Sequence, residues 1–169
     1  ITVTQSTGPV PTVPIPNIDL TPYYNVALAN GQVYNGNTSF SGATVLAPPG
    51  GIIWVNGTLS FNGNANIQGC FIATGDISVN GNGNQIKVAD YPAFMSRDGN
   101  IRINGNGNTH GLIYAKTGTF TGAGNGNNVG SIIVNGAFTG SGNFKGVMYE
   151  NSTPPAAGLR LHWLPVRRA

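Results

Sequence analysis

The sequence predicts an all-β fold: a single-stranded, right-handed parallel β-helix, or β-solenoid, with about 18–24 residues per turn. One short pattern recurs, with an apolar run, a Gly turn, an alternating run and a Gly/Asn corner in each copy. Copies follow one another at spacings of 18, 24, 19 and 18 residues. One turn cannot bury its own apolar face, so turns of this kind stack and bury it together. The right hand follows from the general preference of parallel connections. The aligned apolar position holds Leu59, Ile77, Ile101, Phe120 and Phe138.

The composition supports this prediction and limits the function. The 169 residues include 26 Gly and 22 Asn, whose periodic placement specifies corners rather than disorder. Few residues favour helices. The eight Lys and Arg residues are scattered and the net charge is only +3, which argues against nucleic acid as a partner. The single Cys70 excludes an internal disulfide and is interpreted as a small apolar filler.

Three segments are expected along the chain. Residues 1–22 contain spaced prolines and predict an extended arm, either a linker or a strap laid along the solenoid. Residues 23–150 form the solenoid, with a short helical turn at Leu20–Ala29 capping its N-terminal end and a degenerate first turn at Gly31–Val45. Residues 151–169 form a capping tail. No signal peptide or membrane span is recognised, and the chain is interpreted as a piece of a longer protein.

Alternating residues in the first run of each copy divide into an inner and an outer column. The inner column is large and apolar in every copy, and the position two residues later is small to medium, as a narrow interior requires. The long spacing of 24 residues predicts that Lys87–Tyr91 bulges out as a loop. The inner column consists of Ile53, Phe71, Phe94, Ile113 and Ile132.

The corners predict a structural ladder. Gly supplies positive φ angles, and an Asn one residue later can pass side-chain hydrogen bonds from turn to turn. The predicted ladder consists of Gly63, Gly81, Gly105, Gly124 and Gly142 with Asn64, Asn82, Asn106, Asn125 and Asn143. Asn-Gly between apolar runs is also a hairpin signal, so an antiparallel sandwich is the alternative. A common register for Gly and Asn in five units favours the stacked corner.

The outer column is also apolar, which a solvated face would not require. Three explanations remain open: the Pro-rich arm or the C-terminal tail covers it, a partner subunit docks on it, or it is a platform for glycans. Trp54 and Tyr114 are the expected anchors if a partner binds. This apolar outer column consists of Trp54, Ile72, Met95, Tyr114, Ile133 and Tyr149.

The repeats resemble a known family. Gly75–Asn84 reads GDISVNGNGN, Gly99–Asn108 reads GNIRINGNGN and Gly111–Ala115 reads GLIYA. These motifs, with the Pro-rich lead-in and the Pro154-Pro155 exit, resemble the β-solenoid domain at the C-terminal end of PilX-like, type IV pilus-associated proteins. Many members end in Trp-Arg-Glu, whereas Trp163 is followed here by Leu and Pro. The resemblance implies a structural role at a pilus or cell surface, without catalytic residues.

The residues themselves indicate neither catalysis nor a cofactor or metal site. Asp76 and Asp98 lie near equivalent turns but are interpreted as solvated turn residues rather than a glycosidase pair. His110, at an expected corner, and His162 lack companions at metal-ligand spacing. A second face carries Thr and Ser in several copies, and a flat Thr array would suggest ice binding, but Asp76, Arg102 and Ala137 interrupt it.

The residues therefore favour a non-enzymatic structural or assembly module, and the resemblance implies that it is extracellular, at the bacterial cell surface, and linked to type IV pili or a related filament. Expected partners are pilus or surface subunits, with self-association as a further possibility. The alternative is a carbohydrate-binding or adhesin β-helix. An ice-binding or solenoid-polymer-forming protein is the minor alternative.

Overall fold

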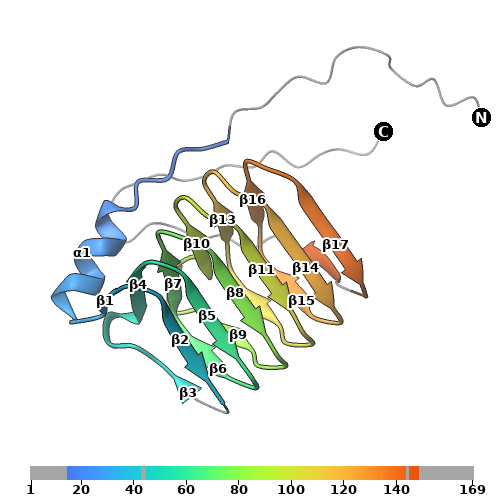
Figure 1. Ribbon diagram of the computed structural model, residues 1–169, viewed down its shortest axis with the longest axis horizontal. Coiled ribbons are helices and arrows are strands. Elements are labelled where there is room, and N and C mark those ends of the chain that lie inside the picture. The colour runs from blue at the N-terminus through green and yellow to red at the C-terminus, as the bar shows by residue number, and fades with distance from the viewer. Residues whose placement is uncertain (1–14, 43–44, 144, 149–169) are drawn as a thin grey trace, which may run out of the picture.

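The computed structural model is a parallel β-solenoid of about six turns, and it describes residues 15–42, 45–143 and 145–148 (Figure 1). Three sheets, each of six strands, run along the stack, and successive turns pair in parallel throughout. The predicted solenoid is confirmed, and the antiparallel alternative is wrong for the described strands.

Each turn contributes one strand to each sheet, in the order A, B, C. Sheet A contains β1 (Val33–Asn35), β4 (Ile52–Asn56), β7 (Cys70–Ala73), β10 (Phe94–Ser96), β13 (Ile113–Ala115) and β16 (Ile132–Val134). Sheet B contains β2 (Thr38–Ser41), β5 (Leu59–Asn62), β8 (Ile77–Asn80), β11 (Ile101–Asn104), β14 (Phe120–Gly124) and β17 (Phe138–Gly142). Sheet C contains β3 (Val45–Leu46), β6 (Asn66–Gln68), β9 (Gln85–Ile86), β12 (Thr109–His110), β15 (Asn127–Val129) and β18 (Lys145–Met148).

The register agrees with the alignment of the repeats. Leu59 pairs with Ile77, and the column continues through Ile101 and Phe120 to Phe138. Thr38 pairs with Leu59, so the degenerate segment around it is the first turn, as predicted. Equivalent side chains therefore lie directly above one another from turn to turn.

The interior is apolar where sheets A and B face it. The predicted inner column lies inside, with Ile53, Phe71, Phe94 and Ile113 fully buried. Aromatic rings extend this core along the stack: Phe61 contacts both Phe71 and Phe94 at ring-centroid distances of 5.0 and 6.2 Å. Stacked aliphatic and aromatic side chains thus join the turns through one continuous core.

Sheet C lines the interior with apolar residues in the first two turns, Leu46 and Ile67, and with polar residues in the next three. Gln85, Thr109 and Asn128 form a buried column on its inner side. Gln85 is satisfied, because its Nε2 donates to the Gly69 carbonyl at 2.8 Å and its Oε1 accepts from the His110 amide at 2.8 Å. The Asn128 side chain is buried without a hydrogen-bond partner among the described residues. His110, expected at a corner, lies on the short strand β12.

The expected insertion does form a loop. It leaves the stack between β9 and β10, where the Val88 carbonyl accepts from the Tyr91 amide at 3.2 Å. Tyr91 meets Tyr23 edge to face at a centroid distance of 6.3 Å. The loop therefore packs against the N-terminal helix rather than standing free.

That helix, α1 (Thr21–Ala29), is where the sequence predicted a helical turn. Asp19 Oδ1 accepts from the Thr21 amide at 2.9 Å, and Gly31, with φ of +66°, follows its end. The helix lies on the outer face of sheet A beside β1 and β4 (Figure 1). The expectation that it caps the end of the stack is therefore wrong, because its apolar residues find their partners on the sheet face.

The segment before α1 follows the same face. Ile15, Ile18 and Leu20 pack against the outer side of sheet A, which agrees with a strap laid along the solenoid. A short 3-10 helix, η1 (Pro49–Gly51), leads into β4. The remainder of the predicted arm, residues 1–14, and the predicted capping tail, residues 151–169, lie outside the described residues. Within the described part of the chain, no helix is long and apolar enough to cross a membrane.

Candidate functional site

The predicted asparagine ladder runs along the corner between sheets B and C. Asn106 Nδ2 donates to Asn82 Oδ1 at 2.8 Å, Asn125 Nδ2 donates to Asn106 Oδ1 at 2.9 Å, and Asn143 Nδ2 donates to Asn125 Oδ1 at 3.0 Å. Four of the five predicted members are thus joined. Among the described residues, no hydrogen bond connects Asn64 to this series.

Two further ladders flank it, and neither was predicted from the sequence. On the sheet B side, Asn104 donates to Asn80 and Asn80 donates to Asn62, each at 3.2 Å. On the sheet C side, amides of Asn84, Asn108 and Asn127 donate to the Asn of the preceding turn. The signal was present, because Asn-Gly-Asn-Gly-Asn places Asn at every second residue. The corner is therefore a lattice of three amide columns.

Glycines separate these columns because adjacent turns approach closely. A Cβ at Gly105 would overlap the Gly81 carbonyl oxygen, and a Cβ at Gly81 would overlap that of Gly63. Their φ angles, +154° and +138°, also lie in the region that favours glycine. The predicted Gly series therefore serves two purposes: it permits the corner conformation, and it allows the backbones to stack.

The side chains of the central ladder are exposed. They form an uncharged surface of regularly spaced amides rather than an internal network. Hydrogen bonds between neighbouring turns restrain each corner against the next, which adds to the backbone ladders of the three sheets.

The apolar outer column is covered by the chain itself. Trp54 is 6% exposed, Ile133 is 7% exposed, and Ile72, Met95 and Tyr114 are fully buried. These residues form a second core with α1 and the segment before it. The interpretation of the column as an accessible docking surface or glycan platform is therefore corrected, because the strap occupies it. Tyr149 lies outside the described residues.

Specific contacts fix the strap on the column. Tyr114 OH donates to the Pro16 carbonyl at 2.9 Å and accepts from the Ile18 amide at 3.5 Å. Tyr24 meets Trp54 edge to face at 5.1 Å, while Trp54 Nε1 donates to Asn56 Oδ1 at 2.8 Å. The two expected anchors therefore hold an intramolecular segment. Burial raises the pKa of the Tyr114 phenol, which stays protonated as a donor at neutral pH.

Cys70 belongs to this second core, as the filler interpretation predicted. Its side chain is fully buried, and burial raises the pKa of the thiol. A thiolate is the nucleophilic form of cysteine, so this environment suppresses its reactivity.

The acidic residues serve the architecture. Asp76 Oδ1 accepts from the Asn100 amide at 2.7 Å, and Asn100 Oδ1 accepts from the Thr119 amide at 2.9 Å, so Asp76 begins a short ladder at the corner between sheets A and B. Asp98 pairs with Arg97 at 2.6 Å and is exposed. Among the described residues, no three His, Cys, Asp or Glu side chains gather as a metal site.

A cavity of about 10 Å³ lies in the interior, with Phe61, Gln85 and Thr109 in its lining. This volume accommodates about one water molecule, not an organic substrate. Its location beside the polar column of sheet C gives such a water hydrogen-bonding partners.

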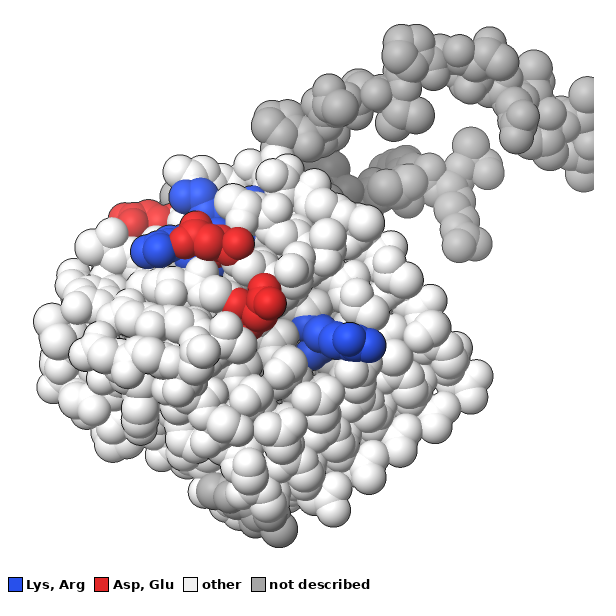
Figure 2. Space-filling model, in the orientation of Figure 1, with Lys and Arg blue, Asp and Glu red and all other residues white. Residues whose placement is uncertain are grey.

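Among the described residues, the outer face of sheet B is a regular surface that the strap does not cover. Its outward residues are mostly Ser, Thr and Asn, and Arg102 is the charged residue among them. Figure 2 shows most of the charged side chains toward one side of the visible surface, with one Lys or Arg side chain standing apart on a broad, otherwise uncharged area. One outward column consists of Ser39, Ser60, Ser78, Arg102, Thr121 and Thr139.

Comparison with known proteins gives no relative: no family model, curated protein or solved structure matches the chain. The resemblance to PilX-like domains therefore stays a prediction from sequence.

Proposed function

We propose that this chain is a non-enzymatic structural module of the bacterial cell surface, working in the assembly of type IV pili or a related filament. The observation that carries the proposal is the continuity of the side-chain ladders, which join turn to turn along one corner. A unit built in this way keeps its shape under load and offers flat faces for packing.

The contact surface in this proposal is the outer face of sheet B. It replaces the apolar outer column, whose aromatic residues hold the strap. The face is nearly uncharged, so little electrostatic repulsion opposes packing against another subunit. Hydroxyl and amide groups on it provide donors and acceptors for a polar, wet contact.

The test is binding to pili purified from the bacterium that encodes the chain, measured by co-sedimentation. Arg102→Glu reverses the charge of an exposed residue in the middle of the face, and we expect at least about tenfold weaker binding. Gln68→Glu, exposed on the outer side of sheet C, is the matched control and should leave binding unchanged. No binding of the wild-type protein, or equal loss in both variants, would refute the proposal.

A carbohydrate-binding module is the second candidate, favoured by the same row of hydroxyl and amide groups. It no longer relies on aromatic platforms, because Trp54 and Tyr114 are buried. A glycan array with the wild type and Arg102→Glu separates the two functions. Binding to a defined glycan that the substitution abolishes, without binding to pili, would favour the carbohydrate function.

A further inference from the structure

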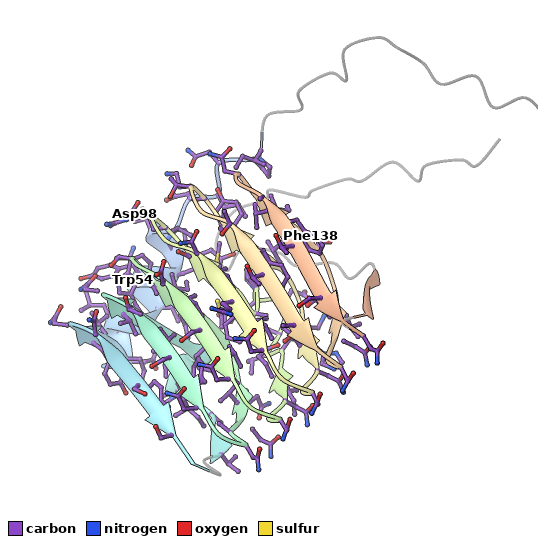
Figure 3. All side chains as sticks on the ribbon, turned by 45° about the vertical axis from the view of Figure 1, so that its right-hand side comes forward. Trp54, Asp98 and Phe138 are labelled. Atoms are coloured by element: carbon purple, nitrogen blue, oxygen red, sulfur yellow. The ribbon has the colours of Figure 1, made fainter. Side chains whose placement is uncertain are left out.

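Among the described residues, no element covers the interior at either end of the stack. At the N-terminal end, Tyr34 and Phe40 of the first turn are only partly buried. At the other end, Phe138 is 53% exposed, and Figure 3 shows it on the last strand of sheet B. Since α1 lies on the outer face of sheet A, it does not cover the first turn. The two end surfaces, β1 with β2 and β16 with β17, therefore present apolar side chains and strand edges.

The backbone polarity of the two end surfaces is complementary. The Thr38 amide donates forward to the Thr58 carbonyl at 2.9 Å, and the Phe120 amide donates forward to the Ala137 carbonyl at 3.0 Å. In a parallel ladder, alternate residues direct their amides and carbonyls to opposite neighbours. Ser39 therefore directs its amide out of the N-terminal end, while Phe138 and Gly140 direct theirs out of the C-terminal end. Donors of one end would meet acceptors of the other.

Side-chain bulk is complementary as well. One interior column of sheet B increases in size from Thr38 to Phe138, whereas the column two residues later decreases from Phe40 to Gly140. Continuing the same register across two copies would place Phe138 over Thr38 and Phe40 over Gly140. Each ring would meet a small residue. The two columns are Thr38, Leu59, Ile77, Ile101, Phe120, Phe138 and Phe40, Phe61, Val79, Ile103, Gly122, Gly140.

In sheets A and B, neither end surface carries the protection that usually prevents strand edges from pairing. Exposed edges are typically blocked by charged residues or proline. Residues 32–46 and 131–143 contain no Asp, Glu, Lys, Arg or Pro. In sheet C, the edge strand at the C-terminal end of the stack, β18, contains one charged residue, Lys145.

We propose that a second copy of this chain stacks on each end, N-terminal surface on C-terminal surface, so that the three sheets continue from copy to copy. This inference rests on the proposed assembly role and names its partner. The contact is head to tail, and because it continues the stack along its own axis it extends into a filament rather than closing into a ring. Each copy would add about 30 Å of length, at about 4.8 Å for each of its turns.

The test measures self-association of the full chain by sedimentation velocity over a range of concentrations. Gly140→Phe fills the space that Phe40 of the next copy would occupy. It should be tolerated within one copy, because the nearest atom to an added Cβ is Phe138 Cε1 at 3.9 Å. We expect association to weaken at least about tenfold. Thr139→Phe, which points outward on the same strand, is the control and should associate as the wild type does.

A second pair of variants blocks the opposite end. Ser39→Pro removes the backbone amide that points out of the N-terminal end. Proline is tolerated at such a position of an edge strand, because its missing N–H would have faced solvent. In the wild type, Ser39 Oγ accepts from Asn62 Nδ2 at 3.2 Å, and both Ser39→Pro and Ser39→Ala lose this contact. Ser39→Ala keeps the backbone amide, so it is the control. We expect only the proline variant to be monomeric. Circular dichroism melting of each variant checks that it is folded.

Mixing the two blocked variants tests the direction of the contact. Ser39→Pro retains a free C-terminal surface and Gly140→Phe retains a free N-terminal surface, so each alone should be monomeric and their mixture should form dimers only. A wild-type protein that stays monomeric at millimolar concentration would overturn the proposal, whatever part of the chain prevents the contact. Association that survives either substitution would also overturn it. The self-association measurements contain no pili, so failure of the stacking proposal can be distinguished from failure of the pilus-binding proposal.

Discussion

Replacing Gly105 by Ala tests the claim that close stacking of backbones requires the glycine corners. The added Cβ would overlap the carbonyl oxygen of Gly81. The two backbones cannot easily move apart, because backbone hydrogen bonds hold each corner to the next turn. The Gly81 amide donates to the Asn104 carbonyl at 2.9 Å, and the Gly105 amide donates to the Ala123 carbonyl at 3.0 Å. The φ of +154° adds backbone strain.

The magnitude follows from these two effects. Backbone strain costs about 1–3 kcal/mol and overpacking about 1–3 kcal/mol, so we expect Gly105→Ala to lower the free energy of unfolding by about 2–6 kcal/mol. Gly140→Ala is the matched control, since the added Cβ meets only an ordinary contact at 3.9 Å. Both substitutions restrict the unfolded chain equally, so their difference isolates the clash in the folded state.

Urea denaturation at micromolar concentration measures both variants without a contribution from self-association. A decrease of this size corresponds to a melting temperature lower by roughly 4–24 °C in a protein of this length. Equal stability of the two variants would refute the reasoning, because the stacked corner would then tolerate a side chain.

The other predictions concern the strap, the ladder and alkaline pH. Tyr114→Phe should cost about 0.5–1.5 kcal/mol by removing the hydroxyl bound to Pro16, with faster hydrogen exchange at Ile18 as the readout. Asn106→Ala should cost no more than about 1.5 kcal/mol in urea denaturation, because water replaces its exposed partners. Burial raises the pKa of Cys70 in the folded state, so unfolding releases a proton more readily as pH rises. Stability should therefore fall above about pH 8.5, and Cys70→Ala should reduce that fall.

The sequence predicted the features that repeat. A large apolar residue at Ile53 and at each equivalent position located the core, and Gly105 with Asn106 located the corner. These predictions succeeded because stacking imposes the same environment on every turn, so a constraint appears in the sequence as many times as there are turns. The additional ladders through Asn104 and Asn108 repeat in the same way, although the prediction included only one Asn column.

Features that occur once were harder to predict. The helix was expected at Leu20–Ala29, but not its position on sheet A, because docking depends on contacts such as Tyr24 with Trp54 between distant segments. The inward side of sheet C was not predicted either. Its strands are as short as two residues, as in Thr109–His110, too short for an alternating pattern to be recognised.

The strap would be the first part of the domain to carry tension applied through the chain before Ile15. Pro16 is bound at Tyr114 in the fifth turn, whereas α1 packs near Trp54 in the second, so the chain runs back along sheet A before it enters the solenoid at Val33. Tension applied through the chain before Ile15 would load the Pro16 contact first, then the helix, and only afterwards the first turn. The strap would peel away in steps and lengthen the tether while the stacked turns remain folded.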